Sequence, residues 1–201
     1  ALVVAAGRGN RAAQDLPKQY VPLGGVPVLR RTLQALLSHP GVEGLQVVIG
    51  PDDAALYEAT VRGLPKLLPP AIGGATRQQS VLNGLEALAA HAPEMVLVHD
   101  AARPFVSADV LGRVIASCEA GVAAIPALAV NETVKRIDMG MIAGTVPREN
   151  LVTAQTPQGF PFAALLAAHR AAAKAGRDDL TDDATPVIDA PEAADQPALA
   201  P

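Results

Sequence analysis

Short apolar runs alternate with longer amphipathic segments along most of the chain. Five runs of strand length are mostly apolar rather than alternating, which is typical of parallel strands covered on both faces. These predicted strands are residues 2–6, 45–49, 95–99, 122–126 and about 151–154. Between them, apolar residues recur at helical spacing, which predicts helices over about 28–37, 52–62, 81–88, 107–120 and 162–175. This order predicts an α/β fold: an open, mostly parallel, Rossmann-like twisted sheet with helices on both faces.

Two segments interrupt this alternation. Residues 128–150 contain the strand-like pieces ETVKRI and MIAGTV around an Asp-Met-Gly turn, which predicts an inserted β-hairpin arm. Residues 190–201 are rich in Pro, Ala and acidic residues without periodicity, and we expect a disordered tail or linker there. The remaining residues, 1–189, are predicted to form one domain that carries the arm.

The composition excludes several classes of protein. No apolar run reaches the ~18–20 residues that a membrane span needs, and the first residues lack the pattern of a secretory signal. A single cysteine, Cys118, cannot support a disulfide framework or a cysteine-based metal cluster, which suits a cytoplasmic protein. The formal charge of −4 is uneven, because residues 178–201 carry −7 and residues 1–177 carry +3. This mildly basic body, with only 2% aromatic residues, argues against a general nucleic-acid binder.

A glycine-rich loop follows the first predicted strand, where open α/β sheets bind their ligands. Gly7 and Gly9 begin a match to G-x-G-x-x-G/A, the fingerprint of NAD-binding domains. That fingerprint requires a helix to begin at once, but three prolines and two glycines interrupt residues 17–27. The acidic residue expected ~20 positions later is also missing. The NAD-binding interpretation is therefore disfavoured.

The same loop carries three cations, Arg8, Arg11 and Lys18, within eleven residues. Glycines let the backbone approach a phosphate closely, and cations neutralise its charge. The alternative is a plain strand-to-loop turn with solvated charges. The concentration of cations at the end of a strand favours a triphosphate site.

Two other segments contain candidate chemistry. Asp100 ends the apolar strand MVLVH, a position that α/β enzymes use for a catalytic or metal-binding carboxylate, although it could also cap the following turn. Mg²⁺ prefers oxygen ligands, typically one or two carboxylates together with substrate phosphates. The pair Gly73–Gly74 precedes a predicted helix, so it could read the edge of a base or form a plain turn before a helix cap.

Several motifs together carry a resemblance to a known family. They are AAGRGNR followed by PKQY, then IGGATRQQSVLNGL at 72–85, VHDAARPF at 98–105, ETVKR at 132–136 and TAQTPQGF at 153–160. In this order the chain resembles the 2-C-methyl-D-erythritol 4-phosphate cytidylyltransferases of the non-mevalonate isoprenoid pathway, from residue 1 to about 185. The resemblance implies transfer of CMP from CTP to 2-C-methyl-D-erythritol 4-phosphate, with release of pyrophosphate and with Mg²⁺ as cofactor.

The resemblance also implies roles for individual residues. Arg11 and Lys18 would be catalytic, because they hold the triphosphate and stabilise the charged transition state. Asp100 would bind Mg²⁺. The implied nucleotide-binding residues are Ala5, Ala6, Gly7, Gly9, Gly74, Ser80 and Asp100. The implied substrate-binding residues are Arg103, Thr133, Lys135, Arg148, Thr156 and Thr181.

The family further implies a homodimer, in which the arm crosses to the partner and Arg148 reaches the partner's site. The motif LTDDAT at 180–185 matches, but the later Asn-x-Lys-x-Thr segment of the family has no counterpart in this sequence. We expect that part of the natural protein is missing or that it is fused to the cyclodiphosphate synthase of the same pathway. Two alternatives stay open: a ribitol-5-phosphate cytidylyltransferase, and a nucleotide-binding domain with impaired catalysis.

Overall fold

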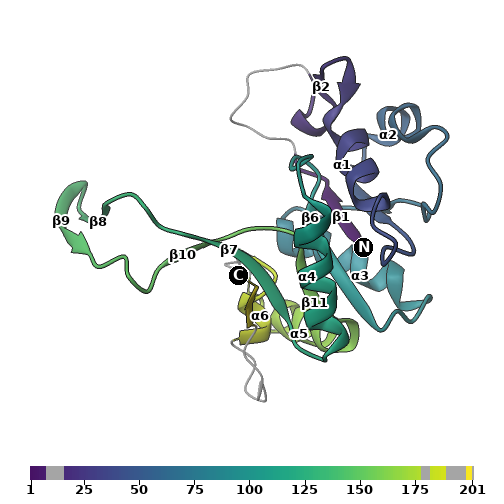
Figure 1. Cartoon of the computed structure of the whole chain (residues 1–201). Helices are drawn as coiled ribbons and strands as arrows, with labels where there is room; N and C mark the ends of the chain where they lie inside the picture. Colours follow the sequence, from purple (N-terminus) through teal and green to yellow (C-terminus); the bar gives the residue numbers. More distant parts are fainter. Residues whose placement is uncertain (8–15, 178–181, 189–197, 201) are drawn as a thin grey trace.

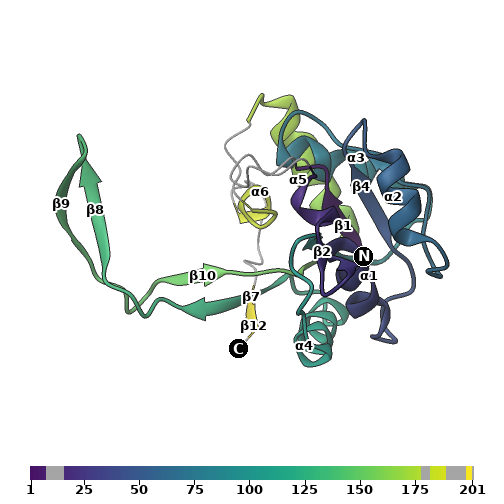
Figure 2. The same cartoon turned by 90° about the horizontal axis from the view of Figure 1, so that it is seen from above.

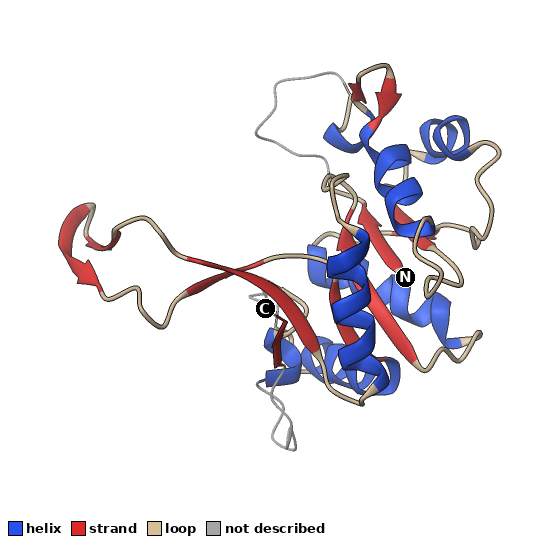
Figure 3. Ribbon diagram, viewed as in Figure 1, coloured by secondary structure: helices blue, strands red, loops and turns tan. Residues whose placement is uncertain are grey.

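A central sheet organises the protein, as seen in a computed structural model that describes residues 1–7, 16–177, 182–188 and 198–200 (Figures 1 and 3). The strands run in the order β10-β7-β11-β6-β1-β4-β5, with β12 paired to β7. Their bounds are β1 Leu2–Ala5, β4 Gln46–Ile49, β5 Ala71–Ile72, β6 Met95–Asp100, β7 Ala124–Ala129, β10 Val152–Ala154, β11 Gln158–Pro161 and β12 Ala198–Ala200. Strand β1 pairs in parallel with β4 and β6, and β4 pairs in parallel with β5. The predicted mostly parallel sheet is therefore confirmed.

Helices cover both faces of this sheet, because successive strand residues point to opposite sides. Val3 and Ala5 pack in one core cluster with α1 (Val28–Leu37) and α4 (Ala108–Glu119). Leu2 packs in the other, with α3 (Arg77–Ala89) and α5 (Phe162–Lys174). Two shorter helices are α2 (Ala54–Val61) and α6 (Thr185–Ile188). No helix in the described ranges is long and apolar enough to cross a membrane.

The part of the segment between β1 and α1 that the structure describes is irregular, as its prolines and glycines predict. In its described part, residues 16–27, a short 3-10 helix η1 (Lys18–Tyr20) precedes a small hairpin of β2 (Pro22–Leu23) and β3 (Val26–Pro27). The α-helix that follows begins only at Val28. Residues 16–27 therefore contain no α-helix, in agreement with the prolines and glycines that interrupt them.

The predicted arm is a long projection from the edge of the sheet (Figure 2). Its base consists of the antiparallel strands β7 and β10, and its tip is a hairpin of β8 (Val134–Asp138) and β9 (Met141–Val146). Met139 and Gly140 form the turn, and both have positive φ, 45° and 79°. A glycine adopts this left-handed conformation without steric cost, which explains its place at the tip.

One expectation at this edge of the sheet was wrong, and one strand was not predicted. Residues 151–154 do not form a buried parallel strand: β10 is exposed and runs antiparallel to β7, at the base of the arm. Strand β11 was not predicted, yet it lies between β6 and β7, antiparallel to β6. Its short sequence, QGFP, contains a glycine and a proline and offers no periodicity. Of the expected tail, 190–201, the structure describes only β12, which pairs in parallel with β7.

Candidate functional site

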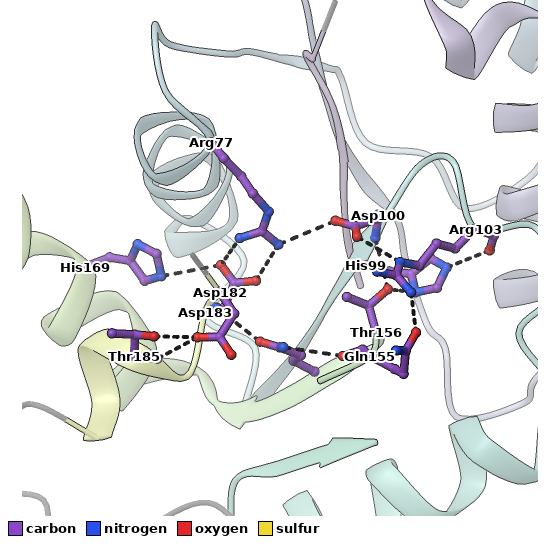
Figure 4. Close-up of polar contacts among 11 residues, drawn as sticks. Arg77, His99, Asp100, Arg103, Gln155, Thr156, His169, Asp182, Asp183 and Thr185 are labelled. Carbon is purple, nitrogen blue, oxygen red and sulfur yellow. Dashed lines mark hydrogen bonds and ion pairs between the residues drawn. The ribbon is translucent and has the colours of Figure 1, made fainter. Parts of the chain in front are cut away.

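Asp100 is the centre of a cluster of charged side chains at the carboxyl edge of the sheet (Figure 4). Arg103 Nε donates to Asp100 Oδ2 at 2.9 Å, and Arg77 NH2 lies 3.5 Å from Asp100 Oδ1. The Asp100 side chain is 33% exposed, so its carboxylate is held between two cations and still faces solvent. This environment suits binding of phosphate and of a hard cation at the same edge.

Arg77 is the first residue of α3 and makes a second, stronger contact. Its NH1 and NH2 donate to the two carboxylate oxygens of Asp183, at 3.0 and 2.7 Å. Burial by itself would lower the pKa of the Arg77 guanidinium, but the charge and hydrogen bonds of Asp183, followed by those of Asp100, raise it above its ordinary value. Arg77 therefore keeps its positive charge beside Asp100.

A hydrogen-bonded chain holds the backbone of the cluster. His99 Nε2 lies 3.0 Å from the carbonyl oxygen of Arg103, and since that oxygen only accepts, Nε2 is the donor. Burial lowers the pKa of His99, so its ring is neutral and Nδ1 accepts from the Thr156 hydroxyl at 3.0 Å. Thr156 Oγ1 in turn lies 3.4 Å from the Asp100 backbone nitrogen. On the other side, Arg103 NH1 donates to Gln155 Oε1.

The Gly73–Gly74 turn is packed closely against the end of β1. A Cβ on Gly73 would lie 2.3 Å from the Cβ of Ala6, so the turn can approach this strand only without a side chain. Ser80 Oγ accepts from the Gly74 backbone N–H at 3.1 Å and donates to the Thr76 carbonyl oxygen at 2.9 Å. In this structure Ser80 shapes the turn, and its contact with a nucleotide stays a prediction, as does that of Gly74.

The expected phosphate loop begins at the same edge. Ala5 is buried, Ala6 is half-buried and Gly7 is exposed. Gln19 Nε2 donates to the Ala5 carbonyl oxygen at 2.5 Å, which holds η1 against the end of β1 and brings the exposed Lys18 to this edge. The predicted residues Gly9, Arg11 and Thr181 lie outside the described residues.

Three predicted substrate-binding residues lie on the arm and not at this edge. Thr133 is exposed next to β8, and Lys135 Nζ donates to Thr145 Oγ1 across the hairpin at 2.7 Å. Arg148 NH1 donates to the Asn131 carbonyl oxygen. A single chain thus brings Asp100, Arg103 and Thr156 together. Strands β8 and β9 at the tip of the arm project away from the sheet (Figure 1).

The sequence placed Arg77 in the turn before the third predicted helix without a role of its own, and it indicated no role for Gln155 or Asp183. Arg77 and Asp183 are 106 positions apart, so no local pattern could pair them. The one sequence feature that could have pointed to them is that each lies within a motif of the family. Arg77 lies in IGGATRQQSVLNGL, Gln155 in TAQTPQGF and Asp183 in LTDDAT.

A metal ion at this site would have few protein ligands. Among the described residues, no three His, Cys, Asp or Glu side chains are grouped so that they could hold a metal. Asp100 offers a partly exposed carboxylate at the sheet edge. Such a donor set fits Mg²⁺, which is commonly bound by one carboxylate together with substrate phosphates and water.

Comparison with known proteins gives consistent results. The family model described as IspD, 2-C-methyl-D-erythritol 4-phosphate cytidylyltransferase, matches residues 1–193. A similar relative is the bifunctional enzyme IspD/IspF of Bradyrhizobium diazoefficiens, 53% identical over 184 residues. The match covers 91% of this chain and 46% of the relative, so the chain spans about half the length of that protein.

Solved structures are similar over nearly the whole chain. A crystal structure of a 4-diphosphocytidyl-2C-methyl-D-erythritol synthase is 32% identical, with a TM-score of 0.79, and the match covers 98% of this chain and 85% of that one. The corresponding synthase from Anaerococcus prevotii DSM 20548 is 27% identical, with a TM-score of 0.82 and coverage of 100% and 87%.

Proposed function

Because the chain belongs to the 2-C-methyl-D-erythritol 4-phosphate cytidylyltransferase family, we propose that it transfers CMP from CTP to 2-C-methyl-D-erythritol 4-phosphate. The products are 4-diphosphocytidyl-2-C-methyl-D-erythritol and pyrophosphate. The observation that carries this proposal is the Asp100 carboxylate, flanked by Arg77 and Arg103 beside the Gly73–Gly74 turn at the edge where α/β sheets bind nucleotides.

The reaction needs positioning and charge stabilisation rather than a covalent nucleophile. An oxygen of the substrate phosphate forms a bond to the α-phosphorus of CTP, and the bond from that phosphorus to the bridging oxygen of the β-phosphate breaks. Both reactants are anionic, so cations must offset their repulsion and the charge that develops on the leaving pyrophosphate. We assign this role to Lys18 and Arg11 on the nucleotide side and to Arg103 on the substrate side.

The remaining site residues have supporting roles in this proposal. Ala5, Ala6, Gly7, Gly9, Gly74 and Ser80 would contact the nucleotide through the phosphate loop and the base-reading turn. Thr156 and Thr181 would contact the substrate. Asp100 would hold Mg²⁺, which supplies further charge neutralisation on the phosphates when bound.

We propose that the protein works as a homodimer in which the arm completes the partner's site. Support comes from the arm itself, whose apolar side chains Ile137, Met139, Met141 and Ile142 are all exposed in the single chain. Isolated two-stranded hairpins are marginally stable, and exposed apolar surface of this kind marks interaction sites. Thr133, Lys135 and Arg148 would then reach the substrate phosphate from the partner.

The names of the similar relatives support a further proposal: the chain is the cytidylyltransferase part of a fused, bifunctional protein. Expression of the full natural reading frame, followed by assays of both enzyme activities, tests it. The cytoplasmic location expected from the sequence stays a prediction.

A pyrophosphate-release assay tests the main proposal. CTP, UTP, ATP and GTP are each combined with 2-C-methyl-D-erythritol 4-phosphate or ribitol 5-phosphate, with and without Mg²⁺. We expect turnover with CTP, Mg²⁺ and the methylerythritol substrate, and a loss of about 10²–10³-fold in kcat for Lys18→Ala. Lys174→Ala, an exposed lysine at the end of α5, is the matched control and should retain wild-type activity.

Other outcomes would contradict parts of the proposal. Equal or better turnover of ribitol 5-phosphate would show that the assigned substrate is wrong. Binding of CTP without turnover, in the full natural protein, would favour an impaired nucleotide-binding domain.

A further inference from the structure

We propose that Asp183 is a positioning residue for the reaction, which acts by fixing the Arg77 guanidinium beside Asp100. This inference rests on the proposed function, since it explains how the site keeps Asp100 in place. The Asp183 side chain is fully buried, and Asp183 is not one of the residues proposed to contact the nucleotide, the substrate or the metal.

The burial of Asp183 makes its pairing with Arg77 obligatory. A carboxylate removed from water is stable only when it is paired with a charge and hydrogen-bonded. Both oxygens of Asp183 accept from Arg77, and its backbone N–H donates to Gln158 Oε1 at 3.1 Å. The Gln158 amide also donates to the Gln155 carbonyl oxygen at 3.3 Å, so Gln158 on β11 connects Asp183 to the segment that precedes β11.

The two carboxylates compete for the same guanidinium nitrogen. Arg77 NH2 lies 2.7 Å from Asp183 but 3.5 Å from Asp100, so Asp183 determines the orientation of the guanidinium. The planar fork of an arginine fixes that orientation when both of its nitrogens are bound. Asp100 therefore faces a cation whose position is set by a buried residue on another part of the chain (Figure 4).

The consequence concerns the second oxygen of Asp100. Arg103 binds Oδ2 at 2.9 Å, and the fixed Arg77 faces Oδ1 at a distance too long for a strong hydrogen bond. The Asp100 carboxylate is thus held between the two arginines, and its Oδ1 atom stays able to bind a ligand. If Arg77 were released from Asp183, it would close on Asp100 and occupy that oxygen.

The expected effect is therefore on kcat rather than on folding alone. Asp183→Asn keeps the size of the side chain but removes its charge, and Arg77→Lys keeps the charge but loses the fork that spans both carboxylates. A misplacement of about 1 Å at a reacting group can cost 10²-fold in rate, so we expect each variant to lower kcat by about 10–10²-fold. We expect the KM for CTP to change less, and the double variant to be no worse than the worse single variant, because both changes break one unit.

Glu86→Gln is the matched control. Glu86 also lies on α3, and it also accepts two hydrogen bonds from one arginine, Arg170 of α5, at 2.7 and 2.6 Å. That pair is exposed and is separate from the hydrogen bonds and ion pairs of Asp100 and Asp183 described above, so its loss should leave kcat unchanged. Thermal melting of every variant shows whether it is folded at the assay temperature.

Two results would overturn the proposal. If Asp183→Asn is folded and has wild-type kcat, the pair with Arg77 is structural only. If the wild-type protein has no turnover, the proposed function fails instead, and crystal structures of the wild type and Asp183→Asn decide the positioning separately. Arg77 should move towards Asp100 in the variant, and an unchanged distance between them would contradict the inference.

Discussion

The carboxyl edge of the sheet and the arm are built in opposite ways. At the edge, polar side chains are paired with one another: Asp100 contacts Arg77 and Arg103, and the fully buried Asp183 binds Arg77, which is 106 positions away in the sequence. On the arm, β8 and β9 pair with each other, and the Met139 and Ile142 side chains are 97% and 71% exposed.

This difference shows which part of the site one chain can form. The edge has a fixed geometry because burial and pairing over-determine it, so Asp100 and the Gly73–Gly74 turn are positioned before any ligand binds. The arm carries Lys135 and Arg148 on a hairpin that has little support from the body of the same chain. Its residues can act at a site only if something else packs against it.

The largest expected effect comes from the core beneath the edge. Phe160 on β11 is fully buried between the helices and the sheet, and Phe160→Ala should lower the free energy of unfolding by about 3–5 kcal/mol. Ile142→Ala on the arm, at low protein concentration, should change it by less than about 0.5 kcal/mol. Urea denaturation measures both.

Protein concentration extends this comparison. A loss of stability for Ile142→Ala that appears only at high concentration would mean that a partner buries the arm. A large loss at every concentration would contradict the view that the arm has little support within one chain.

The sequence predicted the parts of the fold whose pattern is local. Strands β1, β4 and β6 each contain a run of at least three apolar residues, and the buried faces of α1 and α4 follow helical spacing. Strand β11 was not predicted from the sequence, because its burial depends on neighbouring strands from elsewhere in the chain.

The same limit applies to the site. Asp100 could be found because it ends an apolar strand, and Arg103 because it follows in the same motif. The pairing of Arg77 with Asp183 required knowledge of which helix end lies over which loop. Similarly, the Gly-Gly pair indicates a turn, but the sequence does not show that Gly73 packs against Ala6, because that contact is tertiary.

The next largest effect on stability is expected from replacing one glycine at the sheet edge, with a matched replacement on the arm. Gly73→Ala adds a Cβ that would lie 2.3 Å from the Ala6 Cβ, so the turn must move, at a cost of about 1–3 kcal/mol. Gly144→Ala is the matched change on the arm, where a Cβ meets nothing within 4 Å, and should be neutral within about 0.5 kcal/mol. Denaturation curves measure both, and equal losses would mean that the edge is no more tightly packed than the arm.

The smallest effect concerns the buried His169, on α5. Burial lowers its pKa, while Asp183, with an oxygen 3.7 Å from Nε2, acts to raise the pKa and Arg77 acts to lower it. The unfolded chain, with an ordinary histidine pKa near 6.5, therefore binds a proton more readily than the folded protein does. The stabilising contribution of neutral His169 is present above about pH 6.5 and is lost as the pH falls through the lowered value.

The His169→Gln variant isolates this contribution, because His99, whose pKa is lowered in the same direction, is common to both proteins. Between pH 7.5 and 5.5, the wild type should lose more stability than the variant, measured as the difference between their unfolding free energies at the two pH values. A steeper loss in the variant would mean that the Asp183 charge dominates over burial, so that His169 gains a proton in the folded protein. In that case the buried network at the edge would extend from Asp100 through Arg77 and Asp183 to a charged histidine, and its charges would be shared among four residues rather than three.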